Sequence, residues 1–149
     1  MAELSPNTPV LVGIGAVQQK LDQFENAQEP LALMERALRD AAADAMSKVN
    51  TGEELLRRTD EIMVPKGLWD YRDPARLLSG VLGATNATTV LGEIGVLQQT
   101  LMTRACQRIS DGEIEIALVA GAEAKYRSLC ALKSGGEVTD TVQEEAEAD

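Results

Sequence analysis

The sequence predicts an α/β fold in which four mostly parallel strands form a sheet with helices on its faces. Apolar residues recur at steps of three and four within residues 92–112, which predicts an amphipathic helix. The short apolar run at 114–119 that follows has the length of a strand buried on both faces. The same alternation of strand and helix occurs twice earlier in the chain, and successive βαβ units with right-handed crossovers give a parallel sheet.

We expect the first strand at residues 9–15 and the first helix from Pro30. The run Pro-Val-Leu-Val-Gly-Ile-Gly is apolar and closed by glycines, which predicts a central strand. After a polar loop, Pro30 fits the first position of a helix because the N–H that proline lacks has no partner there. Helical spacing of apolar residues continues to about residue 49, and a short helical turn is expected over 53–58.

The second and third strands are expected on either side of a short helix. The second strand covers 60–65 and ends at a proline, and the third covers 87–91, which is rich in β-branched residues. Between them, a helix is expected to begin at Pro74 and to end at Gly83.

The helix within residues 92–112 is expected to turn one apolar stripe inward and to end at Gly112, because glycine tolerates a left-handed backbone. A further helical turn is expected over 125–133. The inward stripe consists of Ile94, Leu97, Leu101, Ala105 and Ile109.

The chain is expected to form one domain with polar ends. Residues 1–8 are predicted to be a flexible N-terminus and residues 9–133 the folded domain. Residues 134–149 carry six acidic side chains and little that is apolar, which predicts an acidic flexible tail.

Composition excludes several classes of function. The 149 residues carry a formal net charge of −10, so we expect no binding to nucleic acid or to an anionic membrane. There is no histidine, which removes the commonest general base and metal ligand, and no metal site is expected. The two cysteines do not make a disulfide framework. No apolar run of roughly 18 residues and no secretory signal is visible, so a cytoplasmic location without a membrane span is expected.

Four pieces of the sequence, in order, resemble the N-terminal part of a thiolase. They are the apolar strand at 10–15, the second strand at 60–64, the helix end at 108–112 (Arg-Ile-Ser-Asp-Gly) and the run at 116–124 (Ile-Ala-Leu-Val-Ala-Gly-Ala-Glu-Ala). The resemblance covers residues from about 9 to 127. It implies a five-layered αβαβα fold of two similar halves, of which this chain supplies an incomplete N-terminal half.

Two further stretches narrow the resemblance. Residues 67–76 (Gly-Leu-Trp-Asp-Tyr-Arg-Asp-Pro-Ala-Arg) and 95–99 (Gly-Val-Leu-Gln-Gln) are similar to a thiolase-like branch of acetyl-CoA acetyltransferases near the sterol-carrier-protein thiolases. This implies acyl transfer with a coenzyme A thioester as substrate and no covalently bound cofactor. It also implies a homo- or hetero-oligomer with a thiolase-like chain.

The family's catalytic residues have no match in this chain. In thiolases a nucleophilic cysteine lies at the N-terminus of the helix that matches 92–112, where the helix dipole favours the thiolate. The matching residues 92–97 hold no cysteine, and the family's histidine lies in the half that is absent. The resemblance thus implies a partial acyltransferase that is not catalytic on its own. The alternatives are a non-catalytic binding or assembly subunit that completes a thiolase-like partner, or a truncated gene product.

Two residues are candidates for a catalytic role. Glu93 is expected at the start of a helix, either as a base at the former nucleophile position or as a residue that only stabilises the helix start. Cys106 is either a replacement nucleophile or a small buried side chain. Cys130 lies in a late segment to which we assign no role.

The loop at 66–73 is the candidate binding region. Trp69, Tyr71 and Arg72 either cover an acyl or pantetheine channel or form a lid over the sheet edge. Glu123 follows a glycine turn that is structural in thiolases, so we expect a structural role. Residues 13–18 begin like a dinucleotide-binding turn, but Gln18 replaces the third glycine, so glycines packed against neighbouring elements are the expected explanation.

Overall fold

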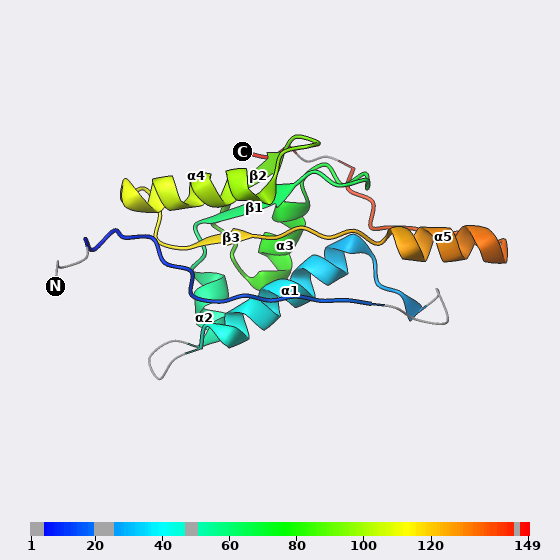
Figure 1. The fold of residues 1–149 in the computed structure, drawn as a ribbon, viewed down its shortest axis with the longest axis horizontal. Helices are drawn as coiled ribbons and strands as arrows, with labels where there is room; N and C mark the ends of the chain where they lie inside the picture. Colours follow the sequence, from blue (N-terminus) through cyan, green and yellow to red (C-terminus); the bar gives the residue numbers. More distant parts are fainter. Residues whose placement is uncertain (1–4, 20–25, 47–50, 145–146) are drawn as a thin grey trace.

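Three parallel strands form a sheet that lies between helices on both of its faces (Figure 1). The structure is a computed structural model that describes residues 5–19, 26–46, 51–144 and 147–149. The elements are α1 (Pro30–Asp44), α2 (Gly52–Arg57), β1 (Glu61–Pro65), α3 (Pro74–Leu82), β2 (Thr88–Gly92), α4 (Gln98–Ser110), β3 (Ala117–Val119) and α5 (Lys125–Ser134).

Strand β1 is the centre of the sheet, whose strand order is β2-β1-β3. Glu61 lies opposite Thr88 on one side and opposite Ala117 on the other. The side chains of Ile62, Met63 and Val64 are fully buried. The predicted α/β class and the parallel strands are therefore confirmed, and so are three of the four predicted strands.

The fourth predicted strand, at residues 9–15, is wrong: this segment is not part of the sheet. Both edges of β1 are already paired, so no central position is free for another strand. The segment instead runs beside α1 (Figure 1), where the N–H of Ile14 donates to Asp44 Oδ2 over 3.0 Å. A Cβ added at Gly13 or Gly15 would collide with backbone carbonyl oxygens of α1, so these glycines permit the close approach.

Helices α1 and α3 cover one face of the sheet, and α4 covers the other (Figure 1). Ile62 and Val64 face the first side, where they join a cluster with residues of α1 and α3. Met63 points to the opposite side and packs against Leu101 and Ala105 of α4. The alternation of neighbouring side chains between two buried faces is the pattern of a strand covered on both sides.

Helix α3 begins and ends where the sequence predicts. Asp73 caps it by accepting the N–H of Arg76 at Oδ1 over 2.9 Å, and Pro74 occupies the first turn. Gly83 ends the helix in the left-handed conformation with φ 76°.

Helix α4 begins later than the sequence predicts. Gly95 has φ 89°, and the N–H of Val96 donates to the carbonyl of Glu93, so a turn occupies the residues after β2. Ile94 and Leu97 consequently precede the helix and are 70% and 71% exposed, which corrects their predicted inward position.

The end of α4 and the other helices agree with the prediction in part. Gly112 has φ 72° and follows the last turn of α4, as expected. The predicted helices at 53–58 and 125–133 correspond to α2 and α5. Helix α1 ends at Asp44, and the predicted continuation to residue 49 falls partly at 47–50, outside the described residues. Among the described helices, none combines the length and apolarity that crossing a bilayer requires.

Candidate functional site

The resemblance to thiolases implies a cysteine nucleophile at the N-terminus of α4, but this position carries no thiol. Leu97 is the N-cap, and the first turn consists of Gln98, Gln99, Thr100 and Leu101. Glu93 is exposed and lies in the turn before the helix, not within its first turn. The dipole effect is confined to the first turn of a helix. The first turn of α4 therefore offers no thiol, and the hydroxyl of Thr100 is the one hydroxyl among its four side chains.

The two cysteines lie far from this position. Cys106 is exposed and sits about two turns into α4, so its expected burial is wrong. Cys130 is partly exposed on α5. Neither thiol faces the first turn of a helix, where a thiolate would be favoured.

The aromatic loop between β1 and α3 is folded onto the body of the protein. Trp69 and Tyr71 are 4% and 1% exposed, and their ring centroids lie 5.1 Å apart. Lys66 Nζ lies 4.7 Å from the Trp69 ring centroid and donates to the carbonyls of Trp69 and Tyr71. Arg72 is exposed beside them. Two of the three predicted binding residues thus lie in the interior, with their rings packed together.

The loop is also tied to the end of β3. Trp69 Nε1 donates to the carbonyl of Ala122 over 3.1 Å, and Glu123 Oε1 accepts the N–H of Leu68 over 2.6 Å. Trp69 and Glu123 line a cavity of about 230 Å³ next to the first turn of α5. Glu123 therefore joins two segments, as a structural role requires.

Tyr71 connects the loop to the start of α1. Its hydroxyl donates to Glu29 Oε2 over 2.9 Å and accepts the N–H of Leu31. Burial and the carboxylate of Glu29 raise the pKa of Tyr71 well above its usual value. Burial alone would raise the pKa of Glu29, but hydrogen bonds from Thr141 and Tyr71 and the charge of Arg127 outweigh it and hold this pKa below its usual value.

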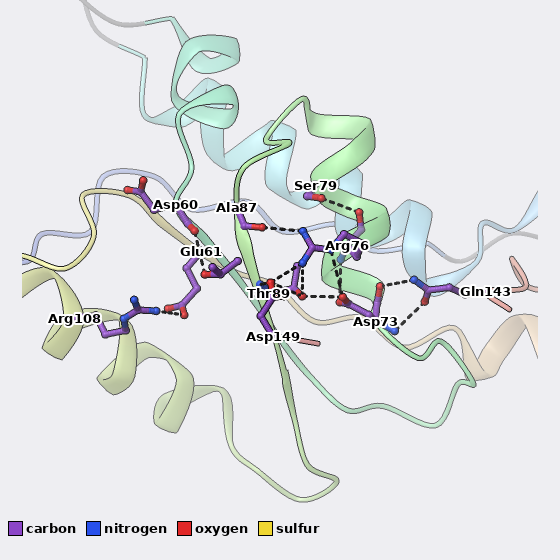
Figure 2. Close-up of polar contacts among 11 residues, drawn as sticks. Asp60, Glu61, Asp73, Arg76, Ser79, Ala87, Thr89, Arg108, Gln143 and Asp149 are labelled. Atoms are coloured by element: carbon purple, nitrogen blue, oxygen red, sulfur yellow. Dashed lines mark hydrogen bonds and ion pairs between the residues drawn. The ribbon is translucent and has the colours of Figure 1, made fainter. Parts of the chain in front are cut away.

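A buried polar cluster lies under the N-terminus of α3 (Figure 2). Asp73 is fully buried, and its Oδ2 accepts the hydroxyl of Thr89 over 2.7 Å. Arg76 donates to the carbonyl of Ala87 over 3.0 Å and lies 3.8 Å from Asp73 Oδ2. The cluster therefore fixes α3 to β2 through a carboxylate whose oxygens both accept hydrogen bonds.

The last described residues contact this cluster. Asp149 Oδ2 accepts the N–H of Thr89 over 2.8 Å and lies 2.5 Å from Arg76 Nη2. The N–H of Thr89 and the charge of Arg76 lower the pKa of Asp149. Gln143 pairs with Asp73 by accepting its N–H and donating to its carbonyl (Figure 2). The flexibility predicted for residues 134–149 stays a prediction, but these two residues have defined partners.

A second buried carboxylate lies in the central strand. Glu61 is 1% exposed and forms ion pairs with Arg108 and Arg104 of α4. Its Oε2 has no hydrogen-bond partner among the described residues. Sequence reasoning missed this group, although an acidic residue directly before the apolar run Ile-Met-Val was a usable signal.

A large cavity lies between the N-terminal segment and β3. Its volume is about 480 Å³, and it is bounded by the segment 6–13, by α1 and α2, and by residues 114–118. Its walls are mainly apolar, including Val12, Leu56 and Leu118. Among the described residues, no three metal-ligating side chains come together.

The chain has a thiolase-like fold. A search of solved structures finds a monomeric SCP2-thiolase-like protein of type 1 from Mycobacterium smegmatis, with a TM-score of 0.65 and 21% identity. The match covers 80% of this chain and 24% of that chain. No family model matches the sequence, and no curated protein matches it. The predicted likeness to a thiolase fold near the SCP2 thiolases is confirmed, and this chain spans about a quarter of the length of that protein.

We expect Glu29 to stabilise the fold in a pH-dependent way. Replacing Glu29 by Gln should lower the free energy of unfolding by about 1 kcal/mol at pH 7. The reason is that the hydrogen bonds from Tyr71 and Thr141 to a charged, partly exposed carboxylate are lost. The folded-state pKa of Glu29 is depressed, so its contribution is complete above pH 4.5 and is lost as the pH falls through the folded-state pKa. Urea unfolding of both proteins across this range measures the difference.

The matched control is Glu137→Gln, which changes an exposed glutamate. A difference between wild type and Glu29→Gln that does not shrink at low pH would contradict the assignment.

Proposed function

We propose that this chain is part of a thiolase-like acyltransferase and does not catalyse acyl transfer on its own. The observation that carries the proposal is the first turn of α4, which offers no thiol to an acyl group. A cysteine nucleophile needs the thiolate, and a helix N-terminus favours this form. The chain also contains no histidine to activate a nucleophile or protonate a leaving group.

The thiolase-like fold supports the acyl-transfer half of the proposal. Its structural neighbour is described as SCP2-thiolase like, and this chain covers only 24% of that protein. The chemistry of a coenzyme A thioester would then depend on residues supplied from elsewhere. According to this proposal, the chain forms part of the scaffold around the α4 N-terminus and contributes no atom that reacts with the acyl group.

The first test is turnover of acetoacetyl-CoA with free coenzyme A by the purified chain. We expect no consumption of acetoacetyl-CoA above that in a protein-free blank, because the α4 first turn lacks a thiol and the chain has no histidine to activate a hydroxyl. Turnover at thiolase-like rates that disappears in Cys106→Ser but persists in Cys130→Ser would overturn the proposal and identify Cys106 as the nucleophile.

The second candidate function is that of an assembly subunit that completes a thiolase-like partner. The observation in its favour is an apolar, strand-like segment outside the sheet next to a large apolar cavity. Contiguous exposed apolar side chains on a folded protein mark interaction sites. Four side chains of this segment are 62–67% exposed: Val10, Leu11, Val12 and Ile14.

The occupant we propose for this surface is the remainder of a thiolase-like fold, carried by a second chain, and in the purified protein a second copy of this chain takes its place. A fold that spans 24% of its neighbour leaves faces that the rest of that fold would cover. The parallel sheet has only three strands among the described residues, and β3 is paired only with β1. An unpaired edge beside apolar side chains is a template for further pairing.

Light scattering after size exclusion tests this second function. We expect wild type to be larger than a monomer and the double variant Val12→Glu, Ile14→Glu to be a folded monomer, because charge on the exposed segment opposes burial. Leu132→Glu is the control, since Leu132 is 77% exposed on α5. A well-folded wild-type monomer at every concentration would contradict the assembly function.

A further inference from the structure

The outer edge of β2 already holds a peptide segment of this chain. Figure 1 places the C-terminus beside β2, and Asp149 N–H donates to the carbonyl of Thr89 over 2.9 Å. In return, the N–H of Thr89 donates to Asp149 Oδ2 over 2.8 Å. Thr89 thus makes a two-way pair with one residue, in which the acidic side chain takes the place of a strand carbonyl.

The geometry of β2 makes Thr89 available for this pair. The N–H of Thr88 donates to Asp60, and the carbonyl of Gly92 accepts from Lys66, so these residues direct their backbone groups toward β1. Alternate residues of a strand direct their backbone groups to opposite edges. Thr89 therefore directs its N–H and carbonyl away from β1, where a further extended segment can bind.

Beside this edge, the guanidinium of Arg76 forms an ion pair with Asp149. Arg76 Nη2 lies 2.5 Å from Asp149 Oδ2, while Arg76 Nη1 is held by the carbonyl of Ala87. Arg76 also lies near the buried carboxylate of Asp73, so its position is fixed from two sides. A guanidinium and a backbone N–H that converge on one oxygen recognise a carboxylate by charge-assisted hydrogen bonds.

A second contact lies at the start of α3. The amide of Gln143 accepts the N–H of Asp73 over 2.9 Å and donates to the carbonyl of Asp73 over 3.0 Å (Figure 2). Asp73 and Thr89 are themselves joined by a 2.7 Å hydrogen bond. The two contacts therefore belong to one continuous surface of α3 and β2.

We propose that the outer edge of β2 at Thr89, together with Asp73 and Arg76 at the N-terminus of α3, is a binding site for an acidic peptide segment. Gln143 and Asp149 are its ligands within the same chain. Binding of an extended segment to a sheet edge takes affinity from main-chain hydrogen bonds and specificity from side chains. Here a glutamine and an aspartate supply the specificity. A free carboxylate such as acetate lacks the N–H that pairs with Thr89, so it binds more weakly.

The test uses full-length chains and a synthetic peptide with the sequence of residues 141–149, acetylated and amidated at its ends. The double variant Gln143→Ala, Asp149→Ala removes both side-chain anchors of the internal ligand and leaves the residues of the site unchanged. An internal ligand competes at an effective concentration on the order of millimolar. We therefore expect the peptide to bind this variant at least about tenfold more tightly than wild type, with the Thr89 amide resonance as the reporter.

Matched controls separate the site from general charge effects. The double variant Glu144→Ala, Glu147→Ala removes two exposed acidic residues of the same segment and should bind the peptide like wild type. A peptide with Asn in place of Asp149 should bind the first double variant at least about tenfold more weakly, because the ion pair with Arg76 is lost. Acetate at the peptide's concentration should leave the Thr89 resonance unchanged.

Three results would each overturn the proposal. These are equal affinity of wild type and the Gln143→Ala, Asp149→Ala variant, equal affinity of the Asp and Asn peptides, and no shift of the Thr89 resonance at saturating peptide. None of these results bears on acyl transfer, so the proposed function stands or fails separately.

Discussion

The burial of residues 61–64 of strand β1 is the constraint on which the rest of the structure depends. Both edges of β1 are paired, and helices cover both of its faces. Ile62 and Val64 anchor one layer of the core, and Met63 anchors the other. Glu61 brings a buried carboxylate into the same strand, where Arg108 of α4 balances its charge. The sheet order, the positions of α3 and α4, and the loop that follows β1 all follow from this strand.

The sequence predicts those elements whose signals are local. Asp73, Pro74 and Gly83 specify the ends of α3 through a cap, a fixed φ and a left-handed residue, and the structure agrees. The segment 9–15 has an apolar pattern that fits a strand, yet strand pairing depends on which edges are free, and no local pattern contains that information. Gly95 determines the late start of α4, because its positive φ forms a turn that apolar spacing does not reveal.

The candidate sites also differ in whether a short stretch of sequence or only the tertiary fold reveals them. The structural role expected for Glu123 comes from the resemblance to thiolases, and Glu123 Oε1 accepts the N–H of Leu68. The cluster of Asp73, Arg76 and Thr89 joins residues from two elements, so it requires the tertiary fold. A segment rich in acidic residues predicts flexibility by composition. Composition does not show that a single aspartate of this segment meets an arginine and a free strand edge.

Together these features describe a thiolase-like α/β unit with a buried core and with two sheet edges at its periphery. The first turn of α4 carries no thiol, and two edges of the sheet lie at its periphery. One edge lies beside β3 and the apolar cavity, and the other lies along β2. These two edges are the surfaces on which we propose assembly and peptide binding.

Amide hydrogen exchange measured by NMR tests the central position of β1 most directly. Amides at the heart of a sheet exchange only by large-scale opening, whereas amides of exposed segments exchange by local fluctuation. In the monomeric protein, the structure predicts the slowest exchange at Ile62, Met63 and Val64, and fast exchange at residues 10–13. Protection at residues 10–13 equal to that of β1 would place this segment inside the sheet and contradict the three-stranded arrangement.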